Sequence, residues 1–200
     1  MKKEFYPNEP TCKAIGITDP TILLDKSLAI LSQGVSLVAK CRNTGKMLGL
    51  ALNEKTMPWD IELYYKLADE VKCKKIKTLL KFYAYVLRST NLFEKFNVPK
   101  VFEITNLSVA LEAQGMGIGN ELVKSSQHIA LNNGFKLMRI DASSLFTARI
   151  CEKMNMELIS EIPYNSYLDE NGLPVFDIPL PHVALKTFIL RLPDKNILRV

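Results

Sequence analysis

The segment Gln114–Asn120, QGMGIGN, holds three glycines in seven residues and carries no charge. It follows residues 100–110, KVFEITNLSVA, whose alternation of side chains and β-branched content predict a strand. The residues after it predict a helix, through an apolar stripe of Ile118, Leu122, Ile129 and Ala130 that closes at the capping signal NNG. Glycines between a strand and a helix N-terminus let backbone N–H groups approach a phosphate without a Cβ in the way. The pattern favours a phosphate-binding loop over a merely tight turn.

Two well-known phosphate loops do not fit this segment. A Walker A loop ends in Gly-Lys-Ser/Thr, whereas Asn120 and Glu121 occupy that place. A dinucleotide fingerprint starting at Gly115 requires glycine at position 120. The pattern that fits is Gln-x-x-Gly-x-Gly, with Gln114, Gly117 and Gly119 at its fixed positions.

The rest of the chain alternates strand and helix patterns. Strands are predicted within 35–41, 45–54, 135–142, 156–164 and 183–192, the first two joined by an RNTG turn. Helices are predicted at Thr21–Leu31, between about 60 and 88 as two pieces or one kinked helix, and in the serine-capped segment 143–155. This order predicts an α/β fold, with a mixed central sheet flanked by helices.

The composition indicates one domain spanning residues 1–200, with 48% hydrophobic and 24% charged residues. The chain shows no signal peptide and no stretch of about 18 apolar residues, so we expect a cytoplasmic protein with no membrane partner. Four cysteines without a CxxC pair, and only two histidines, argue against a metal site and for buried free thiols. The lysine-rich segment 72–81 is read as a solvated helix face, and no nucleic-acid-reading motif accompanies it.

Three stretches resemble one enzyme family. Residues 107–123, LSVALEAQGMGIGNELV, are similar to motif A of the GCN5-related N-acetyltransferases (GNAT). The N-terminal FYPNEPTCKAIG and residues 141–186 resemble the insect arylalkylamine N-acetyltransferase branch, which includes enzymes of the dopamine N-acetyltransferase type. The resemblance implies the GNAT fold, in which a splayed strand pair holds acetyl-CoA, and transfer of an acetyl group to a primary amine such as dopamine, serotonin, tryptamine or octopamine. It implies no metal.

The resemblance also implies a coenzyme site. Backbone amides of the glycine loop would hold the pyrophosphate, and the edge of the preceding strand would pair with the pantetheine arm as an added strand. Arg149 and Lys153, one turn apart, would face a phosphate of the coenzyme or else solvent. The residues assigned to the coenzyme are Leu107, Ser108, Val109, Gln114, Gly115, Met116, Gly117, Ile118, Gly119, Asn120, Ser144, Arg149 and Lys153.

An alkylamine has a pKa of about 10, so a base must remove a proton before it attacks. The resemblance places that base at Glu9, with Glu103 as the alternative. Ser143 and Thr147 are four residues apart, and on one helix face they would donate to the leaving thiolate; helix capping is the alternative role.

The amine pocket is assigned to Asn8, Pro10 and His182 by the resemblance. Asn8 stands where the family has an acid, which changes the charge offered to the amine. Trp59 and Tyr64 are candidates for an aromatic wall, although core packing explains most aromatic residues. The proline-rich segment 173–182 is expected to close over the pocket.

One departure from the family pattern concerns the N-terminus. Relatives carry a first strand and most of a first helix before the Glu-Pro segment, whereas eight residues precede Glu9 here. We therefore expect a shortened domain in which the element holding the base is loosened. The alternatives to an arylalkylamine acetyltransferase are a catalytically weak acyl-CoA-binding module and an enzyme for polyamine, agmatine-like or protein amines. The expected partner is a small amine, and the expected state is a monomer.

Overall fold

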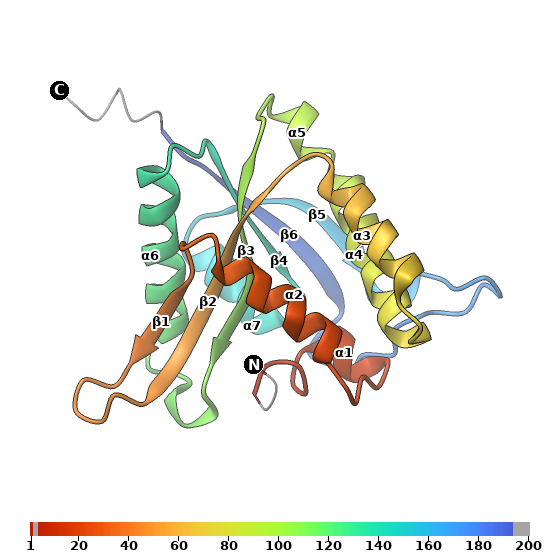
Figure 1. The fold of residues 1–200 in the computed structure, drawn as a ribbon, viewed down its shortest axis with the longest axis horizontal. Coiled ribbons are helices and arrows are strands. Elements are labelled where there is room, and N and C mark those ends of the chain that lie inside the picture. Colours follow the sequence, from red (N-terminus) through yellow and green to blue (C-terminus); the bar gives the residue numbers. More distant parts are fainter. Residues whose placement is uncertain (2–3, 194–200) are drawn as a thin grey trace.

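The computed structural model describes Met1 and residues 4–193, so residues 2–3 and 194–200 of the predicted domain lie outside the described part. Six strands form one sheet in the order β1-β2-β3-β4-β6-β5 (Figure 1). Only β3 and β4 pair in parallel, and the other neighbours are antiparallel, so the predicted mixed sheet is confirmed. The strands are β1 (Leu37–Lys40), β2 (Met47–Thr56), β3 (Val101–Val109), β4 (Leu137–Ala142), β5 (Glu157–Pro163) and β6 (Ala184–Arg191).

The predicted helices are confirmed. They are α2 (Thr21–Leu31), α3 (Asp60–Glu70), α4 (Lys74–Thr90), α6 (Ile118–Asn132) and α7 (Leu145–Lys153). The region between 60 and 88 holds two helices, because Val71 and Cys73 take extended backbone between α3 and α4. Sequence patterns miss α1 (Pro10–Ala14), α5 (Leu92–Lys95) and the 3-10 turns η1 (Leu111–Ala113) and η2 (Tyr164–Ser166), which are too short to show a helical period.

Helices cover both faces of the sheet. One core packs α6 and α7 against β3 and β4 through apolar side chains such as Phe102, Ile140 and Val123. The other core gathers α1 to α4 on the opposite face, where α3 and α4 lie side by side (Figure 1). Because strand residues alternate, Met138 and Ile140 join the first core, while Arg139 and Asp141 line a cavity on the opposite face.

The four cysteines are free thiols, but only Cys12 and Cys151 are buried. The expectation of four buried thiols is therefore wrong for Cys73, which is exposed, and for Cys41, which is half-buried. The lysines of segment 72–81 lie mostly on the exposed side of α4, as a solvated face predicts.

Two kinds of feature are absent from the part of the chain that the structure describes. None of its helices is long and apolar enough to cross a bilayer. Among the same residues, no group of three or more histidine, cysteine or acidic side chains is arranged to hold a metal ion.

Candidate active site

The two central strands separate along their length. Strands β3 and β4 pair from Phe102–Met138 to Ile104–Ile140, but β3 continues to Val109 and β4 to Ala142. The edge of β3 that faces away from β2 is therefore free of a strand partner over Leu107, Ser108 and Val109, which are half-buried. The predicted splayed pair is confirmed, and an extended ligand can add to this edge as a strand would.

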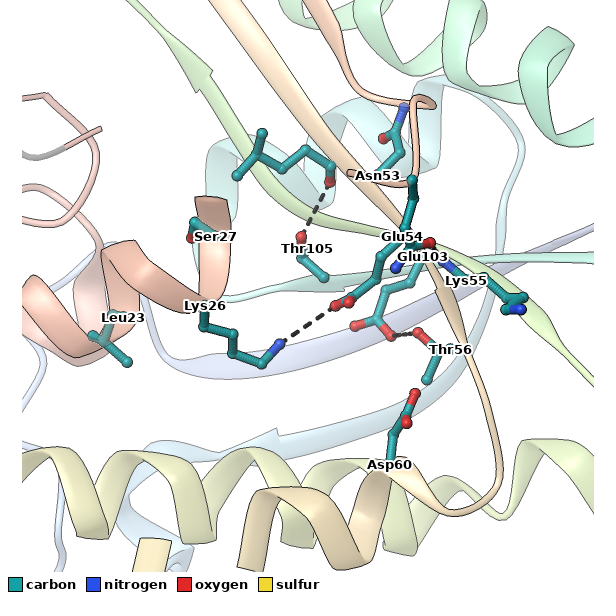
Figure 2. Close-up of polar contacts among 12 residues, drawn as sticks. Leu23, Lys26, Ser27, Asn53, Glu54, Lys55, Thr56, Asp60, Glu103 and Thr105 are labelled. Carbon is teal, nitrogen blue, oxygen red and sulfur yellow. Dashed lines mark hydrogen bonds and ion pairs between the residues drawn. The ribbon is translucent and has the colours of Figure 1, made fainter. Parts of the chain in front are cut away.

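A bulge lies where the strands begin to part. The register between β2 and β3 shifts so that Leu52 faces Asn106 and Asn53 faces Ile104, which leaves Thr105 as the extra residue. Its hydroxyl donates to the Leu52 carbonyl at 3.1 Å (Figure 2). Thr105 and Asn106 both line the main cavity, so the bulge brings β3 to the wall of that cavity.

The glycine loop leads directly into α6. Gly115 and Gly117 have φ angles of +79° and +80°, and each faces open space where a Cβ would stand. Glu121 donates to the Gly117 carbonyl, and no bond of the described residues uses the amides of Ile118, Gly119 and Asn120. Unpaired amides at the start of a 15-residue helix form an anion-binding site. The loop therefore fits a pyrophosphate, as the Gln-x-x-Gly-x-Gly pattern predicts.

Gly119 is needed for helix packing rather than for the approach of a phosphate group. A Cβ on it would lie 2.9 Å from Ile150 Cδ1, so the missing side chain lets α6 pack closely against α7. This contact places α7 beside the loop. Arg149 and Lys153 are exposed on α7, and the described residues give neither an ion pair, which leaves both available to a coenzyme phosphate.

Glu9 is buried, with 7% of its surface exposed, and it caps α1. Its Oε2 accepts hydrogen bonds from Thr11 Oγ1 at 2.6 Å and from the Cys12 amide at 2.7 Å. The other oxygen, Oε1, is buried without a hydrogen-bond partner among the described residues. Glu9 lines the main cavity, so this carboxylate has one fixed oxygen and one that is free to receive a proton.

The main cavity lies between the segment before α1 and helices α2, α3 and α4 on one side, and β3, β4 and β6 on the other. Its apolar walls come from Leu80, Leu87 and Leu185 together with the rings of Tyr64 and Tyr83. Its polar lining residues are Glu9, Lys26, Ser27, Glu103, Thr105, Asn106, Arg139, Asp141 and Ser143.

Charged side chains form the floor of this cavity. Arg139 is 1% exposed and pairs with Asp141 through two hydrogen bonds, Nε to Oδ1 at 3.0 Å and Nη2 to Oδ2, while its Nη1 has no partner within the described chain. Asp141 also accepts from Thr187 Oγ1 at 2.8 Å. Glu103, opposite Arg139 in the strand register, accepts from Thr56 Oγ1 at 2.7 Å, and burial raises the pKa of its carboxyl.

The serine and threonine at the start of α7 separate in the structure. Helix α7 begins at Leu145, so Ser143 lies before the helix and lines the cavity. The hydroxyl of Ser144 is the N-cap, accepts from the Thr147 amide at 3.1 Å and lies 3.0 Å from Thr147 Oγ1. The prediction that Ser143 and Thr147 share a helix face is therefore wrong, because the helix starts two residues after Ser143. Thr147 lies in the capping contact and outside the cavity lining.

The residues assigned to the amine pocket lie beside the cavity rather than in its lining. Asn8 is exposed and donates to the Glu4 carbonyl at 2.8 Å, and Pro10 is the first residue of α1. His182 Nδ1 accepts from the Leu145 amide at 3.1 Å, which places the ring proton on Nε2. Burial lowers the pKa of His182, against a smaller opposing effect of the Glu9 charge.

Two expectations about the walls are wrong. Trp59 is 58% exposed and outside the cavity lining, because it stands at the N-terminus of α3, whereas Tyr64 one turn further lines the cavity. The proline-rich segment 173–182 also contributes no lining residue, since its Phe176 packs against Phe82 at 4.6 Å between ring centroids.

Sequence reasoning missed several lining residues, above all Lys26, Arg139, Asp141 and Asn106. The sequence of β4 carries a signal for two of them, since Arg139 and Asp141 place two charges on one side of a strand whose other side is apolar.

Known structures share this fold, although no protein-family model matches the chain. Arylalkylamine N-acetyltransferase 2 from Aedes aegypti is 32% identical with a TM-score of 0.90, over 96% of this chain and 91% of that one. Mosquito arylalkylamine N-acetyltransferase like 5b is 25% identical with a TM-score of 0.88, over 96% and 91%. A Drosophila melanogaster polyamine N-acetyltransferase, which forms N-acetylagmatine, shares the fold at 23% identity and a TM-score of 0.85, over 95% and 90%. The chain therefore belongs to the insect arylalkylamine N-acetyltransferase branch of the GNAT superfamily.

Proposed function

We propose that this protein transfers the acetyl group of acetyl-CoA directly to the primary amine of a small arylalkylamine. The observation that carries the proposal is the unpaired Oε1 of Glu9 in a cavity that reaches the bulge of β3. Direct transfer to an amine requires a base next to both reactants. Glu9 meets this requirement if the coenzyme lies along the free edge of β3 and the amine lies in the main cavity.

Glu9 has the geometry of the general base. Two donors hold Oε2, so the carboxylate is fixed in orientation while Oε1 is available to the ammonium proton or to a bridging water. Glu103 is the alternative base, and its engagement with Thr56 favours a positioning role.

The coenzyme supplies the acetyl thioester when bound. The amides at the start of α6 would hold its pyrophosphate, and the free edge of β3 would hold its extended arm. Ser143, the one cavity-lining member of the predicted hydroxyl pair, is the candidate donor to the leaving thiolate.

The cavity walls support an aryl substrate. Tyr64 and Tyr83 meet edge to face with 6.3 Å between ring centroids, and leucine side chains complete an apolar surface beside them. An aromatic ring buries a large apolar area at such a surface. A cavity bounded by helices on one side and strands on the other fits a small amine better than a peptide. We also propose that the protein is a monomer that acts on that amine in the cytoplasm, without nucleic acid, a membrane or a metal.

The test is thiol release from acetyl-CoA by the purified chain, with and without a panel of arylalkylamines, alkylamines and a lysine peptide. Release that depends on arylalkylamines supports the proposal. Thermal protection by CoA without release for any amine would instead identify a coenzyme-binding module. Preference for a diamine would favour the second candidate, a polyamine or agmatine-like substrate, for which the carboxylates of Glu54 and Glu103 beside the cavity are the supporting observation.

A further inference from the structure

A second cavity adjoins the main one on the side of β2 and α3. Lys26, Tyr64 and Glu103 line both cavities, so these three side chains form the partition between them. Beyond the partition the lining adds the carboxylates of Glu54 and Asp60 to that of Glu103 (Figure 2). A substrate that extends from Glu9 past the partition would therefore enter an acidic chamber.

Lys26 holds its ammonium group at this partition. It extends from α2 toward Glu54, with Nζ 3.5 Å from Oε1 (Figure 2). The same Nζ lies 4.6 Å from the centroid of the Tyr64 ring. Its side chain is 30% exposed and that of Glu54 is 15% exposed, so the pair is mostly enclosed. Lys26 occupies the place that the ammonium of a ligand would take beside Glu54 and over an aromatic face.

The remaining charged groups near Lys26 do not compete for this position. Glu103 is bonded to Thr56, and Asp60 Oδ2 accepts from the Met57 amide at 2.8 Å. Lys55 is the other cation lining the second cavity, and Arg139 of the main cavity is bonded to Asp141. Glu54 is therefore the carboxylate that pairs directly with Lys26.

We propose that Lys26 is a specificity-determining residue, whose ammonium group occupies the acidic chamber and excludes amines that carry a second positive charge. This inference rests on the proposed function and narrows its substrate class to monoamines. A diammonium ligand would bring a like charge next to Lys26, which repels it in an enclosed site. A monoamine with an aryl end would meet only the aliphatic stem of Lys26 and the Tyr64 ring.

The test is the binding of 1,4-diaminobutane and 2-phenylethylamine to the CoA-saturated protein, measured by calorimetry at about pH 8, with acetylation rates in parallel. In the wild type, burial raises the pKa of Glu54 to about 7, against the lowering effect of Lys26, so Glu54 is mostly ionised at that pH. In the variants the second ammonium of a bound diamine would supply the same lowering effect. For Lys26→Met we expect the ratio of diamine to monoamine affinity to rise at least about 10-fold, a normal size for a change in pocket complementarity. Lys26→Gln is the second variant, which keeps polarity if methionine impairs folding.

Two control variants distinguish the effect of removing the ammonium group from the effect of a less ordered site. Lys26→Arg keeps a cation, and Glu54→Gln breaks the pair while leaving the ammonium, so both should keep the wild-type preference. Adding Glu54→Gln to Lys26→Met should abolish the gain in diamine affinity. An unchanged ratio in both folded Lys26→Met and Lys26→Gln overturns the inference. Because binding is measured apart from turnover, an inactive protein that still gains diamine affinity would contradict the proposed function and leave this inference standing.

Discussion

The proposed coenzyme side and the proposed amine side of this site are built in different ways. On the coenzyme side, the open edge of β3 and the unpaired amides before Glu121 present mainly backbone atoms. On the amine side, the cavity is lined by side chains from the segment before α1 and from α2, α3, α4, β3, β4 and β6. This difference means that one strand–loop–helix unit suffices to bind the coenzyme, whereas binding of the amine depends on the tertiary fold. It also predicts which kinds of substitution each side tolerates.

The largest expected effect falls on the charged floor of the amine side. Arg139→Met removes one partner of a buried pair and leaves Asp141 with Thr187 alone, so the free energy of unfolding should fall by about 3 to 5 kcal/mol. Denaturant titration measures it. The matched control is Arg191→Met, because the ion pair of Arg191 with Glu157 is exposed. This substitution should lower the free energy of unfolding by at most about 1 kcal/mol. Equal losses in the two variants would contradict the importance of the buried floor.

The pH dependence of stability probes the same side. Burial raises the folded pKa of Glu54 from 4.5 to about 7, so the folded state holds its proton more tightly than the unfolded chain. The free energy of unfolding should therefore decrease as pH rises from about 4.5 to about 7, by at most about 3 kcal/mol, and level off above. Glu54→Gln should flatten this part of the curve. Identical curves for the variant and wild type, followed by thermal unfolding, would show that Glu54 is not the titrating group.

Coenzyme affinity should depend on the loop backbone and not on its side chains. Gly117 has a φ of +80°, which a residue with a Cβ rarely adopts, so Gly117→Val should weaken CoA binding about 10-fold or more. Met116 is 69% exposed, and Met116→Ala should leave the dissociation constant within about 2-fold. Calorimetric titration with CoA measures both. A larger loss of CoA affinity for Met116→Ala than for Gly117→Val would contradict the view that backbone atoms, and not side chains, bind the coenzyme.

The smallest expected effect concerns His182, which contacts the start of α7. His182→Ala removes the acceptor for the Leu145 amide and should lower the free energy of unfolding by about 1 kcal/mol. Burial lowers the pKa of His182 in the folded state below its ordinary value of 6.5. The neutral ring therefore stabilises the fold fully above pH 6.5, and this stability is lost as the pH falls through the lowered pKa of the folded state. His182→Ala should remove this acidic loss. Thermal unfolding measures this loss. If the variant loses the same stability at acidic pH, groups other than His182 cause it.

The same contrast explains what could be predicted from the sequence. The glycine spacing and the alternation of β3 are local patterns, so the loop, the helix after it and the mixed sheet are predictable. The N-cap role of Ser144 and the position of Ser143 before α7 depend on where the helix starts, which periodicity leaves uncertain by a few residues. Lys26 and Glu54 stand 28 positions apart and meet only when α2 packs beside β2, so no spacing rule brings them together.

In the proposed mechanism, Glu9 removes the amine proton while the loop holds the coenzyme independently. The most direct test is amine-dependent thiol release by wild type and Glu9→Gln across pH, with CoA affinity measured in parallel. Glutamine keeps an acceptor for the Cys12 amide, so α1 should persist. The account predicts a fall in kcat/KM of about 10² to 10⁴-fold at neutral pH with unchanged CoA affinity. Unchanged kcat/KM in the variant would contradict it and turn attention to Glu103.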